Sequence, residues 1–491
     1  MSKRVKSIVI GASVLALLIA ALLLLNLLDK PADDTSSSSG TSSTIPLFEH
    51  EKNDVDLISI TNATGSYEVK QVEENKWTIE EFSGLALDDS GLSGLASSAG
   101  TITASELVEK DAPDLAKYGL ADPLADVKVT FKGDAEPVEF HIGDLAPGGT
   151  QYYFANQDSS DVYIVTSASL SGMLKAKTDF ISKNVVEAVS AENPMIVEQM
   201  TVTRKDWTLP LTFTRVDSTV TGAAANAANG SGTSSAPLTA DTAVYKVTSP
   251  VTADADSTTA QPVVNGLTGL TAASAVKAFP TDEDIAAAGL NDPQATVIAK
   301  VGTKTYELTI GNTLEEGGTN YYGMLQGGNV LYSFTAESLP WLTVNPFDMI
   351  VDLVVLPFID DVERVDVMFQ DKTYSFDIEG SGDDITFKSG GKALDDDRFR
   401  KFYQFLLGAP VDELNDGEAV SGEPAARITY VYKDHSKPSE VVEFYMSQEP
   451  RRMIISINGN AWFKARSAYL DTRMGQNIDN ILNDRDILSD W

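Results

Sequence analysis

Two stretches of this chain repeat the same five pieces in the same order, about 170 residues apart. The first stretch starts with Tyr-Gly-Leu-Ala-Asp-Pro at 118–123 and continues as VKVTF, VEFHIGD, GGTQYYFA and DVYIVTSASL. The second starts with Ala-Gly-Leu-Asn-Asp-Pro at 288–293 and continues as TVIAKV, YELTIGN, GGTNYYGM and NVLYSFTAESL. Five matched pieces in register indicate a structural unit that the chain builds at least twice.

Patterns upstream of each stretch complete the unit. Alternating segments such as SYEVKQV and LPLTFTRV predict strands, whereas Leu92, Leu95, Ala99 and Ile102 recur at helical spacing. A third, divergent copy keeps this order in VERVDVMF, YSFDI, RITYVYK and VVEFYM but lacks the Gly-Leu-x-Asp-Pro turn. We therefore predict an α+β fold class, in which a single N-terminal transmembrane helix is followed by tandem repeated α+β units with antiparallel sheets, each packing one main helix.

The length of the chain, 491 residues, exceeds what one hydrophobic core supports, so several domains are expected. We place repeat 1 at residues 49–190, repeat 2 at 191–350 and the divergent repeat 3 at 351–491. An insertion rich in Ala, Gly and Ser interrupts repeat 2 at about 217–241 and is predicted to be a disordered loop.

The N-terminal residues carry a membrane signal. Three basic residues precede an apolar run at 8–28, which at about 1.5 Å per residue spans roughly the 30 Å hydrocarbon core. Because positive charge stands before the run, residues 1–28 are predicted to be a cytoplasmic N-terminus and transmembrane helix, followed by a flexible Ser/Thr-rich tether at 29–48. A cleaved signal peptide is the alternative, although its apolar core is normally only about 7–15 residues long.

These features predict a single-pass protein of the bacterial cell membrane. The N-terminus is expected in the cytoplasm and the bulk of the chain outside it, with residues 8–28 contacting the bilayer.

Charge and cysteine content exclude several classes of function. The 71 acidic and 37 basic residues give a net charge of -34, which repels phosphate backbones, so nucleic acid is not an expected partner. The chain has no cysteine, which rules out disulfides, thiolate metal sites and a lipid-modified cysteine.

The Gly-Leu-x-Asp-Pro turn, the Ile-Gly-Asp/Asn strand ends at 142–144 and 310–312, and the Gly-Gly-Thr-x-Tyr-Tyr hairpins resemble the domain-of-unknown-function 4340 (DUF4340) family. The resemblance covers about residues 50–350 well and 351–491 weakly. Members of that family occur in bacterial envelope proteins, often encoded beside an ABC-type permease and ATPase related to gliding-motility transporters. The resemblance therefore implies an accessory role beside permease and ATPase subunits, and it supplies no catalytic residues.

Four tyrosines form the candidate binding surface: Tyr152, Tyr153, Tyr321 and Tyr322. Neighbouring residues on a strand point to opposite faces, so each pair offers one ring per face, although core packing and shielding of the sheet also account for such rings. The Gly-Gly pairs before them predict hairpin turns, because the Lys-Ser/Thr of a P-loop is missing. Runs of Asp lack the spacing of an EF-hand loop and are interpreted as solvated caps and turns.

No pattern in the sequence predicts an enzyme or a cofactor. The leading hypothesis is a non-catalytic, membrane-anchored extracytoplasmic accessory protein of an ABC-type transport system. The alternative is a surface module that binds cell wall or another ligand without a transporter partner. A hydrolase built from paired carboxylates is a third hypothesis, which requires a concave site with close acidic pairs.

Overall fold

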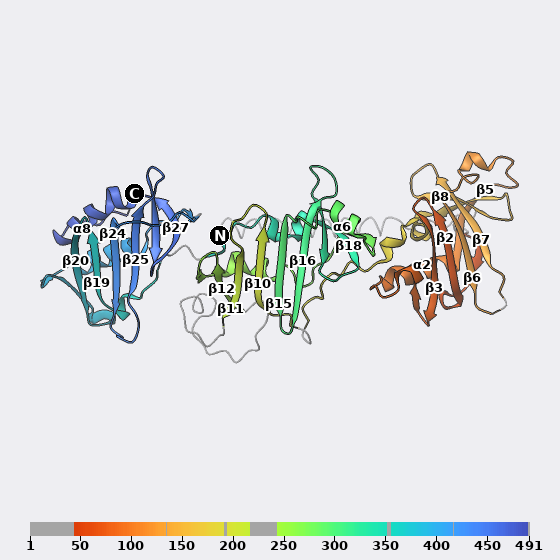
Figure 1. The fold of residues 1–491 in the computed structure, drawn as a ribbon. Coiled ribbons are helices and arrows are strands. Elements are labelled where there is room, and N and C mark those ends of the chain that lie inside the picture. The colour runs from red at the N-terminus through yellow and green to blue at the C-terminus, as the bar shows by residue number, and fades with distance from the viewer. Residues whose placement is uncertain are drawn as a thin grey trace, which may run out of the picture. The chain divides into compact units, whose positions relative to one another are not determined.

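The structure is a computed structural model that describes residues 44–133, 135–190, 194–216, 243–350, 355–415 and 417–489. The apolar run at 8–28 and the insertion at 217–241 lie outside the described residues. Figure 1 shows the described residues as three antiparallel sheets, drawn in red and orange, in green, and in blue.

The first sheet has nine strands in the order β1-β5-β9-β8-β7-β6-β2-β3-β4. Its strands are β1 (Ile45–Glu49), β2 (Val55–Asn62), β3 (Gly65–Glu73), β4 (Lys76–Thr78), β5 (Thr101–Glu109), β6 (Ala125–Phe131), β7 (Val138–Leu145), β8 (Gln151–Asn156) and β9 (Val162–Thr166).

The second sheet also has nine strands, in the order β13-β12-β11-β10-β15-β16-β17-β18-β14. They are β10 (Val197–Arg204), β11 (Leu211–Val216), β12 (Val244–Ser249), β13 (Ala253–Asp254), β14 (Ser274–Ala278), β15 (Ala295–Val301), β16 (Lys304–Thr313), β17 (Asn320–Leu325) and β18 (Val330–Thr335).

The third sheet follows the order β22-β21-β20-β19-β24-β25-β26-β27-β23. Its strands are β19 (Val362–Phe369), β20 (Lys372–Glu379), β21 (Thr386–Ser389), β22 (Lys392–Ala393), β23 (Glu413–Leu414), β24 (Ala426–Tyr432), β25 (Glu440–Met446), β26 (Arg452–Ile457) and β27 (Asn460–Arg466).

Eight strands follow one order in all three sheets, and the ninth differs. In the second and third sheets the ninth strand, β13 or β22, extends the edge beside the third strand of the unit. In the first sheet it is β1, which pairs with β5 at the opposite edge. Because β1 begins at Ile45, an ordered strand starts inside the segment predicted to be a tether.

The described chain divides into two compact parts, which differ from the three repeated units. One contains residues 44–63 and 96–174, and therefore holds β1, β2 and β5 to β9. The other contains residues 64–95 and 175–489, and therefore holds β3, β4 and all strands of the second and third sheets.

In each of the three repeated units, the opening strand pairs with the first strand of the meander, and the register of this pairing is the same in all three. The burial patterns of β2, β10 and β19 agree in placing the first, fourth and sixth residues in the interior. A register shift after the first residue explains the spacing from first to fourth, because a β-bulge sets two residues of one strand against one of the other. At the far end a buried alanine is the partner each time, in the pairs Asn62↔Ala125, Arg204↔Ala295 and Phe369↔Ala426.

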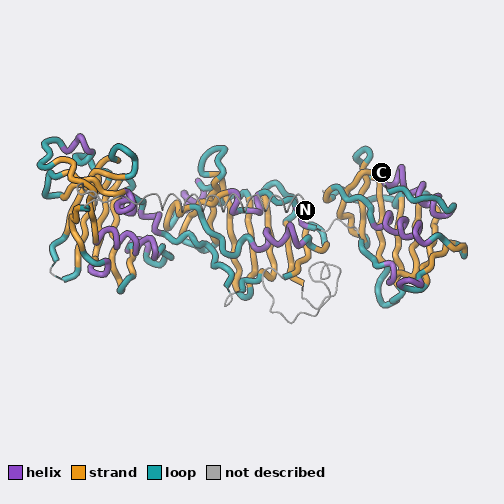
Figure 2. Tube along the Cα trace, turned by 180° about the vertical axis from the view of Figure 1, so that it is seen from behind, coloured by secondary structure: helices purple, strands orange, loops and turns teal. Residues whose placement is uncertain are grey.

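A helix follows the third strand of each unit: α2 (Asp89–Gly100), α5 (Ser257–Asn265) and α7 (Asp396–Leu407). Figure 2 shows helical segments lying across one face of the second and third sheets. An aspartate caps each helix start by accepting a hydrogen bond from a backbone N–H that has no partner within the helix. The bonds are Gly91 N to Asp88 Oδ1 at 3.0 Å, Thr258 N to Asp256 Oδ1 at 2.8 Å and Arg398 N to Asp395 Oδ1 at 3.0 Å.

The prediction of an α+β fold class is wrong, because the described residues are mainly β. The remaining described α-helices are short: α3 (Ser167–Leu170), α6 (Asp282–Ala287) and α8 (Gly475–Leu482), the last preceded by a π-helix at Tyr469–Met474. The hairpin and the meander, which sequence patterns treat separately, join into one broad sheet in each unit because their first strands pair. No helix within the described ranges is long and apolar enough to span a membrane.

The two repeated glycine motifs meet in space. In the second sheet, a Cβ at Gly311 of the Ile-Gly-Asn strand end would lie 2.1 Å from the carbonyl oxygen of Ala288. The next residue, Asn312, donates its N–H to that same oxygen at 2.8 Å. Gly289 of the turn has φ of 74°, and a Cβ there would lie 2.5 Å from the Asn312 side chain. Gly311 is needed because a side chain there would collide with the backbone of Ala288. Gly289 is needed because a side chain would collide with Asn312 and because its positive φ favours glycine.

The first sheet repeats this contact with its own residues. A Cβ at Gly143 would lie 2.3 Å from the carbonyl oxygen of Tyr118, and one at Gly119 would lie 2.4 Å from the side chain of Asp144. The two motifs thus recur together because they make one packing contact, which the chain forms twice.

We expect Gly311→Ala to destabilise the protein by about 2–3 kcal/mol, because the added methyl group collides with backbone that cannot move aside without breaking the Asn312 hydrogen bond. Chemical denaturation of the purified protein measures the change. Gly94→Ala is the matched control: a Cβ there meets nothing within 4 Å, and alanine favours the interior of α2. Equal stability of the Gly311→Ala variant and the wild-type protein would contradict the packing assigned to this motif.

Candidate functional site

The four candidate tyrosines lie in equivalent strands of two sheets, Tyr152 and Tyr153 in β8 and Tyr321 and Tyr322 in β17. All four are half-buried. The structure therefore provides two separate pairs, each beginning just after a Gly-Gly hairpin turn. The two pairs differ in what surrounds them.

In the first sheet, Tyr153 packs inside a small apolar cluster. Its ring lies 4.9 Å from the ring of Tyr118 in an edge-to-face arrangement, beside Leu120 and Val162. Tyr118 in turn donates its hydroxyl to Glu109. Packing accounts for Tyr153, since an edge-to-face pair of this kind stabilises a fold without any ligand.

In the second sheet, Tyr321 lines a cavity of about 430 Å³. The volume lies within the range of about 300–1,000 Å³ that small-molecule sites occupy. We call it the Tyr321 cavity, and the residues lining it are Arg204, Lys205, Asp206, Gln294, Tyr321 and Leu342.

The end of strand β10 positions the charged residues that line the Tyr321 cavity, because the strand ends at Arg204 and the chain turns there. The Arg204 guanidinium binds Asp206 with both ends, Nε to Oδ1 at 2.8 Å and Nη2 to Oδ2 at 2.5 Å. Nη1 donates to the carbonyl oxygen of Val344 at 2.8 Å, and the Trp207 ring lies 4.6 Å from the guanidinium carbon. Three contacts thus hold this arginine in one position.

The contacts of Asp206 with Arg204 stabilise its ionised form. Its hydrogen bonds from Arg204 lower its pKa below the ordinary value for aspartate. A bidentate guanidinium–carboxylate pair of this kind is among the stronger polar contacts in proteins.

The second Gly-Leu-x-Asp-Pro turn provides the acidic partner of the other charge pair. Lys205 forms an ion pair with Asp292, the aspartate of the second Gly-Leu-x-Asp-Pro motif, and its backbone N–H donates to Gln294 at 3.0 Å. Helix α6 leads into this turn and begins with a capping box between Thr281 and Asp284. A hydrogen bond from Lys277, with two from Thr281, lowers the pKa of Asp284 to about 2.

Two polar groups of the Tyr321 cavity make no hydrogen bond to the residues that the structure describes: the Tyr321 hydroxyl and the Gln294 side-chain amide. Both are half-buried. They supply a phenol, which both donates and accepts, and an amide with two donors and an acceptor. Across the described ranges, no group of three or more His, Cys, Asp or Glu is placed to hold a metal ion.

Sequence patterns singled out Tyr321 but not Arg204, Lys205, Asp206 or Gln294. The signal was present in the comparison of repeats, because Arg204 aligns with Asn62 and Phe369 in the pairing register. At this strand end the second repeat has an arginine where the other two have Asn62 and Phe369, and the arginine begins the charged run Arg-Lys-Asp.

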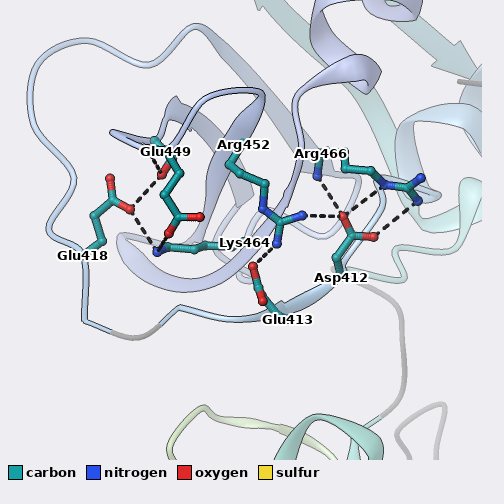
Figure 3. A network of polar contacts seen from close by, with 8 residues as sticks. Asp412, Glu413, Glu418, Glu449, Arg452, Lys464 and Arg466 are labelled. Carbon is teal, nitrogen blue, oxygen red and sulfur yellow. Dashed lines mark hydrogen bonds and ion pairs between the residues drawn. The ribbon is translucent and has the colours of Figure 1, made fainter.

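A second group of charges lies in the third sheet, where the Gly-Leu-x-Asp-Pro turn is missing (Figure 3). The Lys464 ammonium, on a side chain only 4% exposed, pairs with Glu418 at 3.0 Å and Glu449 at 2.9 Å. Bonds from the Gln448 N–H, the Ser447 hydroxyl and Lys464 lower the pKa of Glu418.

The same network continues along strands β26 and β27. Arg452 bonds Asp412 at 3.1 Å and also pairs with Glu413, while Arg466 pairs with Asp412 at 3.3 Å. These ion pairs fasten the segment around β23 to the sheet edge (Figure 3), where β23 pairs with β27.

We expect Lys464→Ala to lower stability measurably, since the Lys464 side chain is only 4% exposed and its ammonium group pairs with both Glu418 and Glu449. A double-mutant cycle with Glu418→Gln, measured by urea unfolding, should show that the effects of the two substitutions are coupled. Lys388→Ala is the control, because its pair with Glu379 joins two exposed side chains and is worth less than about 1 kcal/mol. Additive effects of Lys464→Ala and Glu418→Gln would refute the contribution assigned to this pair.

Comparison with known families yields one match. A family model described as "Domain of unknown function (DUF4340)" matches residues 77–240 and, a second time, residues 246–419. Both matches begin within the third strand of a repeated unit, the first at Trp77 in β4 and the second at Lys246 in β12. Neither a curated protein nor a solved structure matches the chain.

Proposed function

The chain belongs to the DUF4340 family of domains of unknown function, and from that premise we propose that it is a non-catalytic accessory protein of an ABC-type transport system. The observation that carries the proposal is the repetition itself. Three sheets share strand order and register, while their edges and their exposed side chains differ.

Such an arrangement suits binding of partner proteins. The shared register uses the buried positions for folding and leaves the exposed positions of each sheet free to vary. Partner subunits that bind different sheets would then be held along one chain. The permease and ATPase implied by the family resemblance are the partners we propose.

The proposal places the three sheets on the outer side of a bacterial membrane, with membrane contact through residues 8–28. The order of charges supports this orientation, because Lys3, Arg4 and Lys6 precede that segment and acidic residues follow it. The net charge of -34 is compatible with an outer location, since it disfavours contact with anionic head groups.

Affinity purification of the tagged full-length chain from native membranes tests the partnership. We expect an ABC-type permease and its ATPase to be enriched together at least about tenfold over a tagged, unrelated membrane protein of similar abundance, because a stable complex survives mild extraction. Quantitative mass spectrometry gives the measurement. Recovery of intact protein with no transporter subunit enriched would contradict the proposal.

The absence of cysteine permits a clean test of location. Thr303, in the exposed turn between β15 and β16, can be replaced by cysteine as the sole thiol of the chain. The Thr303→Cys protein should react with a membrane-impermeant maleimide in intact spheroplasts, to the same extent as after permeabilisation. Ser2→Cys, in the segment placed inside the cell, is the matched control and should react only after permeabilisation. The reverse pattern would rule out the proposed orientation.

A further inference from the structure

The Tyr321 cavity brings together three strands of the second sheet that are far apart in the chain. Arg204 ends β10, Gln294 immediately precedes β15, and Tyr321 lies in β17. The strands β10, β15, β16 and β17 are neighbours in the middle of the sheet, and their pairing register places the three residues at the same end of these strands. Nothing about the transport proposal requires this cavity, so an inference about it stands separately.

The charges of the cavity are already neutralised. Arg204 is held by the Asp206 carboxylate and Lys205 by the Asp292 carboxylate. An anionic ligand would therefore have to compete with one carboxylate for each cation, Asp206 for Arg204 and Asp292 for Lys205, and Asp206 itself, 61% exposed, would repel it. The lining thus favours a ligand without net charge.

The free groups of the cavity favour hydroxyl ligands. The Gln294 amide and the Tyr321 hydroxyl provide donors and acceptors close together, and the exposed oxygens of Asp206 add further acceptors. A hydroxyl group both donates and accepts, so a ring of hydroxyls satisfies such a mixed set better than a ligand with acceptors only. Buried polar groups that find no partner would instead oppose binding.

The aromatic ring of Tyr321 and the side chain of Leu342 supply the apolar part of the cavity. The face of an aromatic ring carries partial negative charge, which attracts the slightly positive C–H groups of a ligand laid against it. A pyranose ring presents C–H groups on one face and hydroxyls around its rim. Its two kinds of surface match the two kinds of group in the cavity.

The polar lining is particular to the second sheet. At the positions of Arg204, Gln294 and Tyr321, register and motif alignment place Asn62, Leu124 and Tyr152 in the first sheet and Phe369, Ala425 and Met453 in the third. The tyrosine is thus shared by two sheets, whereas the arginine and the glutamine are not. This makes Tyr152 a built-in control for Tyr321.

We propose that the Tyr321 cavity binds one residue of a neutral sugar, with the pyranose ring against Tyr321 and its hydroxyls bonded to Gln294 and Asp206. Arg204 positions the Asp206 carboxylate through its two-ended bond and through its bond to Val344, so that it takes part without contacting the sugar. An open cavity of this size gives weak binding to a single sugar unit and stronger binding to a polymer that reaches several copies of the chain.

Ligand-observed NMR and isothermal titration of the full-length protein test the proposal, with glucose, galactose, N-acetylglucosamine and inorganic phosphate as probes. At least one sugar should bind, and more tightly than phosphate. Tyr321→Ala should weaken that binding at least about tenfold, which corresponds to about 1.4 kcal/mol, because it removes the ring surface. Tyr152→Ala should leave the affinity unchanged.

Gln294→Ala provides an independent variant in case Tyr321→Ala disturbs the half-buried core around the ring. It removes only an amide without partners among the described residues, so the fold should persist, and sugar affinity should fall about threefold to tenfold. Thermal unfolding of each variant verifies folding. The proposal is overturned if none of the sugars binds, if phosphate binds more tightly than every sugar, or if Tyr152→Ala weakens binding as much as Tyr321→Ala. It is overturned as well if Gln294→Ala folds normally and binds sugar like the wild-type protein.

Discussion

The pairing between the opening strand of each unit and the first strand of its meander is the interaction on which the rest of the structure depends. Without the pairs β2–β6, β10–β15 and β19–β24, each unit would divide into a three-strand piece and a separate meander. The register is firmly set, because a slip by one residue would turn the buried valines, isoleucines and methionine of these strands toward solvent. The same register shift after the first residue in all three pairs shows that the constraint applies three times.

Once this pair is fixed, the connection between helix and meander is free to vary. It enters the sheet at the alanine end of the pair, and in two units it is held by a glycine turn packed under the Ile-Gly strand end. In the third unit the glycine turn is missing, and Glu418, in the segment before β24, is bonded by Ser447, the Gln448 N–H and Lys464 instead. Two different local solutions therefore serve one long-range arrangement. The ionic solution adds a dependence on charge that the glycine solution lacks.

Local features of this fold were predictable from sequence, and the long-range ones were not. Alternation in VKVTF or RITYVYK and the acids Asp88 and Asp395 predict strands and helix starts, because their causes lie within a few residues. The fold class depends on which strand meets which, and adjacent segments do not encode that, so the α+β prediction was wrong. Only part of the Tyr321 cavity could be predicted. Tyr321 is recognisable from the hairpin turn before it, whereas Arg204 is brought near it only by the three strand pairings between β10 and β17. The predictions for 8–28 and 217–241 fall outside the described residues.

The repeats also indicate where to look for function within a chain of this kind. Positions that all three sheets share, such as the buried alanines at 125, 295 and 426, are explained by folding alone. Tyr321 shares its place with Tyr152, so the tyrosine by itself says little about a ligand. What distinguishes the second sheet is that Arg204 is anchored by Asp206, Val344 and Trp207 at a strand end where the other sheets carry Asn62 and Phe369. The first sheet also holds a backbone carbonyl from this position, because the Asn62 amide donates to Met173 at 3.1 Å, but it does so with a shorter side chain and without a carboxylate partner like Asp206. Ordering the longer arginine costs more side-chain entropy, so the paired Arg204 and Asp206 are the features of this cavity that folding of the sheet explains least.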